Sequence, residues 1–127
     1  MVQKTHLKIN RKLCGEPVEI MDGSSKVRLT TTTQMAADQY GLIHGGFIFG
    51  LADYAAMLAV NHPNVVLGSA NVKFLKPVKT GEVLIARARL KNTEGRKIIV
   101  VVKVKRDNEV VFEGEFFCFV PEKHVLA

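Results

Sequence analysis

The most apolar stretch of the chain runs from residue 43 to residue 61, and its side chains are apolar or small on every helical face. A helix of this kind is normally buried on all sides. A bilayer span needs roughly 20 apolar residues and tolerates a central Asp poorly, whereas this stretch offers only about 16 helical residues. We therefore predict a central core helix, whose single carboxylate, Asp53, requires a partner or a shifted pKa.

On both sides of this stretch the pattern changes to the period-two alternation that is typical of strands. A hairpin of two strands is expected before the helix, at 18–21 and 27–33, followed by a connector over 34–43 with a helical turn at 35–38. Four longer strands are expected after the helix, at 65–75, 82–91, 98–105 and 110–120. Because the turns between these four are short, the pattern favours an antiparallel meander.

Two strands, one buried helix and four strands predict an α+β fold in which a curved antiparallel sheet wraps around one long central helix. The length of 127 residues favours a single domain over 1–127. The strand at 98–105 is apolar on both faces, so one face can cover the helix and the other calls for a second subunit or edge-to-edge sheet pairing.

Cysteine usage and the N-terminal residues bear on location. Cys14 and Cys118 lack metal-ligand spacing, and the first 17 residues lack the apolar segment of a secretory signal. We expect a cytoplasmic protein with two reduced thiols, without a bound metal and without a membrane partner.

The net charge of +6 is concentrated between residues 71 and 106, where eleven basic residues face two acidic ones. Most of these residues fit a solvated strand face. The alternative is an anionic partner, and a phosphorylated cofactor fits better than nucleic acid, because no nucleic-acid-binding pattern accompanies the charge.

The helix opens on His44-Gly45-Gly46. Backbone N–H groups at a helix start are unpaired and favour negative charge, and glycine lets a ligand approach them closely. This arrangement suits an oxyanion hole or a phosphate site. The alternative is a tight turn, with His44 as an ordinary turn residue.

Asp53 lies about 12 Å along the helix from Gly45. A carboxylate and an oxyanion donor must both come within roughly 3 Å of one reacting carbonyl group, so a single helix cannot supply both. If the two cooperate, a second copy must contribute one of them, which predicts an obligate dimer with two equivalent sites. The alternative is that Asp53 caps a loop or pairs with an Arg of the sheet.

At these residues the sequence resembles the hotdog-fold acyl-CoA thioesterases, particularly the phenylacetate-pathway (PaaI-like) type. Their pattern of His-Gly-Gly followed by Leu-Ala-Asp is matched by 44–46 and 51–53. A second match is Phe74-Leu75-Lys76-Pro77 followed by Gly81-Glu82, similar to the family's Phe-x-x-Pro and Gly-Asp/Glu pattern. The order of elements agrees over about residues 18 to 120.

The resemblance implies hydrolysis of an acyl-CoA thioester, with CoA as part of the substrate and no other cofactor. Gly45 would polarise the carbonyl, Asp53 of a partner subunit would act as nucleophile or general base, and His44 would position the thioester or support the turn. The other expected substrate-binding residues are Gly46, Asp38, Phe47, and, for the CoA phosphates, Lys73, Lys76, Arg87 and Arg96. Many relatives carry an Asn shortly before the His-Gly-Gly, whereas this chain has Asp38 six residues before His44, so either Asp38 takes part of that role or the loop is built differently. Family members form homodimers that pair into homotetramers.

The segments 69–81 and 110–116 also resemble the effector domain of the malonyl-CoA-responsive fatty-acid repressors (FapR), which binds its acyl-CoA without turnover. In those sensors the position of Asp53 is commonly an amide, so Asp53 favours an enzyme. A dehydratase of the same fold is a third reading, although that class typically spaces its His and carboxylate differently. The acyl group remains open.

Overall fold

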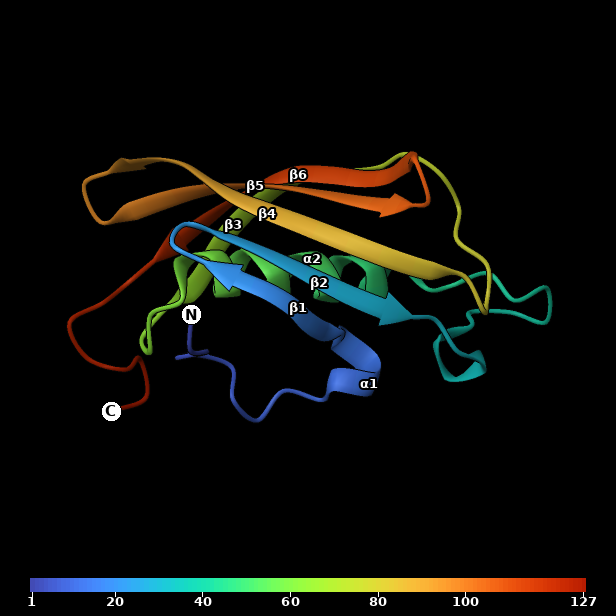
Figure 1. Ribbon diagram of the computed structural model, residues 1–127, viewed down its shortest axis with the longest axis horizontal. Coiled ribbons are helices and arrows are strands. Elements are labelled where there is room, and N and C mark those ends of the chain that lie inside the picture. Colours follow the sequence, from blue (N-terminus) through green and yellow to red (C-terminus); the bar gives the residue numbers. More distant parts are fainter.

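The computed structural model describes residues 1–127, which form one six-stranded antiparallel sheet around one long helix (Figure 1). The elements are α1 Arg11–Cys14, β1 Glu16–Met21, β2 Ser24–Thr30, a 3₁₀ turn Thr33–Met35, α2 Gly45–Val60, β3 Val66–Phe74, β4 Val83–Glu94, β5 Lys97–Arg106 and β6 Glu109–Phe119. The predicted α+β fold with a curved sheet and a central helix is confirmed. The turn of helix expected at 35–38 instead lies at Thr33–Met35.

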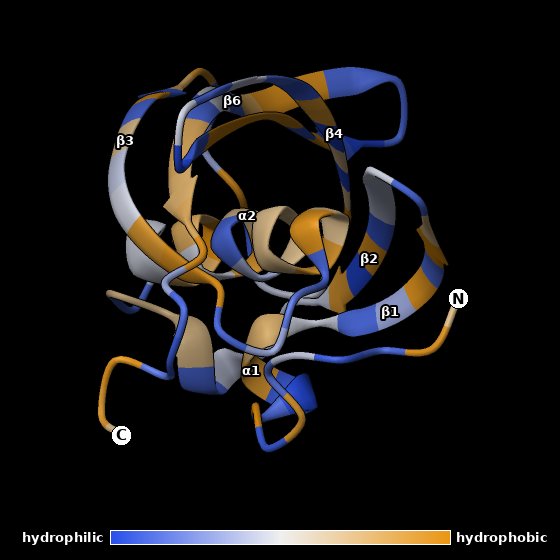
Figure 2. Cartoon of the chain, turned by 90° about the vertical axis from the view of Figure 1, so that its left-hand side faces the viewer, coloured by the Kyte–Doolittle hydropathy of each residue, from blue (hydrophilic) through white to orange (hydrophobic).

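Helix α2 is the centre of the hydrophobic core, as its all-round apolar sequence predicts. Leu51, Tyr54 and Leu58 are fully buried, and the helix packs mainly against β2, β4 and β5. Figure 2 shows α2 inside the curve of the sheet, with α1 on the side that the sheet leaves open. No helix has the length and apolar character needed to cross a membrane.

Two buried contacts fix α2 to its surroundings. The Ser25 hydroxyl on β2 donates a hydrogen bond of 2.6 Å to the carbonyl of Ala55. Gly15, which follows α1, has φ +117° and lies where a Cβ atom would be 2.7 Å from Val27 Cγ1 and 2.9 Å from Leu51 Cδ1. Only glycine fits this close approach between the N-terminal segment, β2 and the helix.

The strand order is β1-β2-β4-β5-β6-β3. The hairpin of β1 and β2 is as predicted, and β4, β5 and β6 form a meander. The prediction that all four later strands form a meander is wrong, because β3 pairs with β6 at the sheet edge and β2 takes the place beside β4. The turn expected at 77–81 between neighbouring strands therefore belongs to a longer connection, 75–82, which joins an edge strand to the middle of the sheet.

Candidate functional site

The start of α2 carries free backbone donors. His44 is the N-cap residue, and its side chain makes no capping hydrogen bond. The N–H groups of Gly45 and Gly46 donate to no backbone or side-chain acceptor, whereas the N–H of Phe47 already bonds to the His44 carbonyl at 3.0 Å. Two polarised donors thus remain at the positive end of a sixteen-residue helix.

Two rings explain why both of these positions are glycine. A Cβ atom at residue 45 would lie 3.2 Å from Phe74 Cε1, and one at residue 46 would lie 3.0 Å from His44 Cδ2. The His44 ring also meets Phe47 edge to face, with centroids 6.2 Å apart. Side chains therefore pack directly on the backbone that bears the free donors.

A pocket of about 210 Å³ opens beside these donors. It is lined by Ile43, Gly45, Ile48, Phe74 and the four residues that follow β3, Leu75–Val78. Residues 75–78 form one wall of the pocket. The strand order explains their position, because the connection from β3 to β4 must cross the end of the sheet where α2 begins. The Ile43 N–H donates to the Val78 carbonyl at 2.8 Å and fixes the wall to the residues before the helix.

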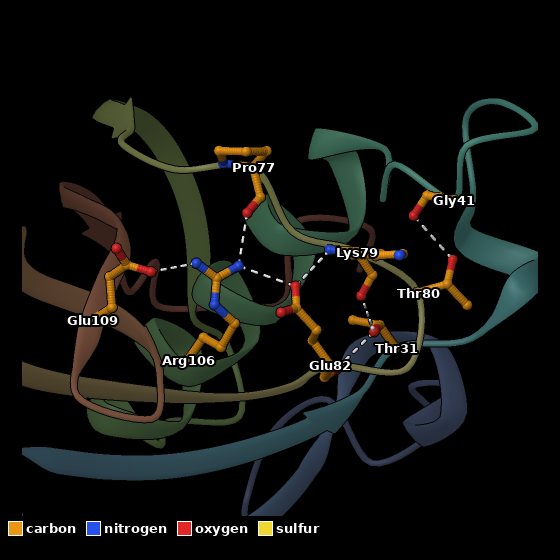
Figure 3. A network of polar contacts seen from close by, with 8 residues as sticks. All are labelled: Thr31, Gly41, Pro77, Lys79, Thr80, Glu82, Arg106 and Glu109. Carbon is orange, nitrogen blue, oxygen red and sulfur yellow. Dashed lines mark hydrogen bonds and ion pairs between the residues drawn. The ribbon is translucent and has the colours of Figure 1, made fainter.

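Arg106, at the end of β5, holds the far side of this connection (Figure 3). Its Nη1 donates to the Pro77 carbonyl at 2.8 Å and to Glu82 Oε1 at 3.0 Å, while Nη2 pairs with Glu109. Glu82 also accepts from the Lys79 N–H at 2.7 Å. This bond, with a further contribution from Arg106, holds the pKa of Glu82 below its usual value.

The segment before α2 is joined to the same connection. Thr80 Oγ1 donates to the Gly41 carbonyl at 3.1 Å, as drawn in Figure 3. Asp38 is exposed, and its Oδ1 accepts from the N–H groups of Tyr40 and Leu42 at 2.9 and 3.2 Å. Asp38 thereby shapes the loop before His44, and its predicted contact with substrate stays a prediction.

Asp53 is a carboxylate without a partner. Its Oδ1 is buried and accepts no hydrogen bond, and the side chain is in no ion pair. Burial raises its pKa from 3.8 to about 6. The structure does not bear out the alternative in which Asp53 caps a loop or pairs with an Arg of the sheet.

Two thiols share the surroundings of Asp53. Burial, with a smaller contribution from the negative charge of Asp53, raises the pKa of Cys14 and brings that of Cys118 to about 12. Both cysteines are free. Because their pKa values are raised, both thiols stay protonated near neutral pH. Among these three neighbouring acids, only Asp53 can lose its proton at that pH.

The pocket and Asp53 are separate within one chain. Asp53 does not line the pocket beside Gly45, as expected for residues about 12 Å apart on one helix. Of the four basic residues predicted to contact CoA phosphates, Lys76 lines this pocket. Lys73 and Arg87 lie together in a groove on the outer face of the sheet, and Arg96 pairs with Glu122 after the end of β4.

Sequence reasoning assigned no role to Phe74, which lines the pocket, or to Arg106, which holds the connection behind it. Phe74 was part of the Phe-x-x-Pro match, but its contact with Gly45 joins positions 29 residues apart and has no local signal. Arg106 counted only as one of many basic residues, although its half-buried side chain bonds to Pro77, Glu82 and Glu109 in the structure.

A family model described as the thioesterase superfamily matches residues 40–113, which contain the helix start, Asp53 and the pocket wall. The chain belongs to the thioesterase superfamily. The resemblance inferred from the two motifs is thereby confirmed at the level of the family.

Solved structures share the fold of this chain. An uncharacterised protein of Pyrococcus horikoshii is 55% identical with a TM-score of 0.98, covering 100% of this chain and 98% of that one. A sigma28-regulated virulence protein of Campylobacter jejuni is 31% identical with a TM-score of 0.93, covering 97% and 87%. A hypothetical thioesterase of Streptococcus pneumoniae with coenzyme A, 23% identical over 84% of each chain with a TM-score of 0.76, shares the fold. So does the PaaI protein of E. coli, 23% identical over 88% of this chain and 83% of that one, with a TM-score of 0.79.

Curated relatives are longer than this chain. A methylthioribose-1-phosphate isomerase of Aquifex aeolicus is 56% identical over 114 residues, which are 90% of this chain and 25% of that protein. A FapR transcription factor of Caldanaerobacter subterraneus is 28% identical over 119 residues, which are 93% of this chain and 60% of the repressor. The chain thus spans a quarter of the first and less than two thirds of the second.

Proposed function

We propose that this protein is an acyl-CoA thioesterase, which hydrolyses a thioester to a free acid and CoA. The observation that carries the proposal is the half-buried side chain of Asp53, whose buried Oδ1 has no hydrogen-bond partner and whose pKa is raised to about 6. A structural carboxylate is normally paired, because an isolated buried charge is costly. A pKa near 6 instead suits a group that is ionised at neutral pH and available for reaction.

The start of α2 supplies the complementary half of the chemistry. A thioester carbonyl in the pocket beside Phe74 would accept from the free N–H of Gly45, which stabilises the negative charge that develops on the oxygen. His44 and Phe47 flank this backbone, and Lys76 at the pocket rim would meet a CoA phosphate.

The carboxylate reaches this carbonyl only from a second copy of the chain. With about 12 Å between Gly45 and Asp53 in one helix, two antiparallel helices side by side would bring each Asp53 to the other's Gly45. A homodimer with two equivalent sites is therefore part of the proposal, and its pairing into a tetramer is a further expectation. Asp53 would then act in one of two ways. It could attack the thioester carbonyl, which releases the CoA thiolate and leaves a mixed anhydride that water hydrolyses to the acid and the Asp53 carboxylate. It could instead take a proton from a water molecule that attacks the carbonyl, with that proton passing to the departing CoA thiolate.

The proposal is tested by measuring free-thiol release from short, long, aromatic and malonyl-type acyl-CoAs. The native protein, Asp53→Asn and the control Asp107→Asn in the exposed β5–β6 turn are compared. Turnover that falls by at least a hundredfold in Asp53→Asn, with the control unchanged, supports a thioesterase. Equal turnover in native protein and Asp53→Asn would remove Asp53 from the mechanism.

A second candidate is a non-catalytic acyl-CoA-binding module, favoured by the likeness to FapR over 93% of this chain. It predicts saturable binding of an acyl-CoA, without thiol release for any member of the panel. Binding is measured by calorimetry with the same compounds, so the two candidates are separated in one set of samples.

A further inference from the structure

The outer face of the sheet, which points away from α2, bears a groove of about 640 Å³. Six basic side chains and three carboxylates line it, an excess of three positive charges. The basic residues are Lys26, Lys73, Arg87, Arg89, Lys103 and Lys105. The groove shares no residue with the pocket beside Gly45.

Strand register arranges part of this charge in one row. Lys26 on β2 is directly opposite Arg87 on β4, and Arg87 is directly opposite Lys103 on β5. The row continues to Glu113 on β6 and Lys73 on β3. Neighbouring strands are about 4.8 Å apart, so three cations stand side by side within roughly 10 Å.

These three cations form no ion pair that would reduce the repulsion between them. The six ion pairs of the structure involve none of Lys26, Arg87 and Lys103. Like charges directly opposite one another in a sheet are destabilising. A second copy of the same face would double the excess of positive charge, so charge complementarity favours an anion over a copy of this chain.

We propose that this groove binds a small molecule with two or three linked phosphate groups, as in a nucleoside polyphosphate. A phosphate chain presents several negative charges at short spacing, which matches a row of adjacent cations. Arg87 at the centre of the row can bind phosphate oxygens in a bidentate manner. The groove volume lies within the range of small-molecule sites, roughly 300–1,000 Å³.

Linked phosphate groups could come from two sources, a free nucleotide or the diphosphate of CoA. The site does not depend on thioester hydrolysis, because it lies on the opposite face of the sheet from Asp53. Failure of the proposed hydrolysis and failure of this site are therefore measured separately.

The test is calorimetric titration of the full chain with inorganic triphosphate as probe. Native protein is compared with Arg87→Gln/Lys103→Gln and with Lys8→Gln/Lys12→Gln, which removes two positive charges from the exposed N-terminal segment. We expect saturable binding by native and control proteins, and binding at least tenfold weaker in the outer-face variant. Without ligand, the outer-face variant should have a thermal midpoint no lower than the native one, because like-charge repulsion is removed.

The source is identified by competition, in which displacement of triphosphate by ATP indicates a nucleotide and displacement by CoA alone indicates the CoA diphosphate. The proposal is overturned if triphosphate does not saturate, if both double variants weaken its binding equally, or if neither ATP nor CoA competes. It is also overturned if light scattering shows native protein associating through this face, with a smaller species in the outer-face variant.

Discussion

The ring of Phe74 packs on the backbone of Gly45 so closely that a Cβ atom at residue 45 would lie 3.2 Å from Phe74 Cε1. The two residues come from the end of β3 and the start of α2, and both line the same pocket. This contact explains how a strand at the sheet edge contributes to the surroundings of the free helix donors.

We expect Gly45→Ala to lower kcat/KM at least tenfold without lowering the thermal midpoint. The ring must move by a few tenths of an ångström, and small displacements at a reacting centre carry large losses of rate. Ala in the first turn of a helix is itself favourable by about 0.5–1 kcal/mol relative to Gly. The measurement is steady-state kinetics beside a thermal melt, and Gly45→Ala/Phe74→Leu should recover part of the activity. A loss of stability that parallels the loss of activity would contradict this interpretation.

The pKa of Asp53 predicts the pH dependence of activity. Because the carboxylate form is the reactive one, kcat/KM should rise with pH through an apparent pKa of about 6 and then level off. The profile is measured between about pH 4.5 and 8.5, and circular dichroism at each pH checks that the protein stays folded. A flat profile across pH 6 would exclude Asp53 as the group that must lose a proton.

The same pKa predicts how Asp53 affects stability. The pKa is higher in the folded chain than its usual 3.8, so the cost of burying the carboxylate is absent below about pH 4 and complete above about pH 6. Asp53→Asn should therefore stabilise the protein by about 2–3 kcal/mol at pH 8 and by much less at pH 4. Denaturant unfolding at both pH values measures this difference. Equal effects at the two pH values would show that burial of charge is not the cause.

Arg106→Gln should loosen the connection from β3 to β4. It removes the donors to Pro77 and Glu82, and we expect a loss of about 1–2 kcal/mol with faster amide exchange over residues 75–82. Arg96→Gln is the matched control for stability, because the exposed pair of Arg96 with Glu122 contributes less than about 1 kcal/mol. Exchange that is unchanged in Arg106→Gln would mean that other contacts hold this segment.

Gly15→Ala should be among the most destabilising small substitutions in the chain. Its backbone is at φ +117°, and the added Cβ would meet Val27 Cγ1 at 2.7 Å, so a cost of about 2–4 kcal/mol is expected. Gly95→Ala, at φ +62° with no neighbouring atom within 4 Å, should cost only about 1 kcal/mol. Thermal unfolding of both variants measures the two costs. The loss in Gly95→Ala reports the cost of the positive φ alone, and the additional loss in Gly15→Ala reports the steric clash.

The sequence by itself determined the central helix and the approximate positions of the six strands, although it did not predict the short helix α1. An apolar pattern on every helical face is local, so α2 was predicted to within two residues of its observed start at Gly45. Alternation likewise predicted the strands, and the two motifs predicted the family and pointed to the donors at the helix start and to Asp53. Whether Asp53 has a partner was open in the sequence and was decided by the structure.

Only the tertiary structure decided which strands are neighbours. Pairing of β3 with β6 joins segments about 45 residues apart. The alternation of apolar and polar residues along a strand shows which face is buried, but it does not show which other strand is the hydrogen-bonded neighbour. For the same reason the contact of Phe74 with Gly45 and the row of Lys26, Arg87 and Lys103 were invisible in the sequence. The row depends on register between distant strands, and the contact depends on how the end of β3 packs on the start of α2. Only the packed sheet around the helix establishes both.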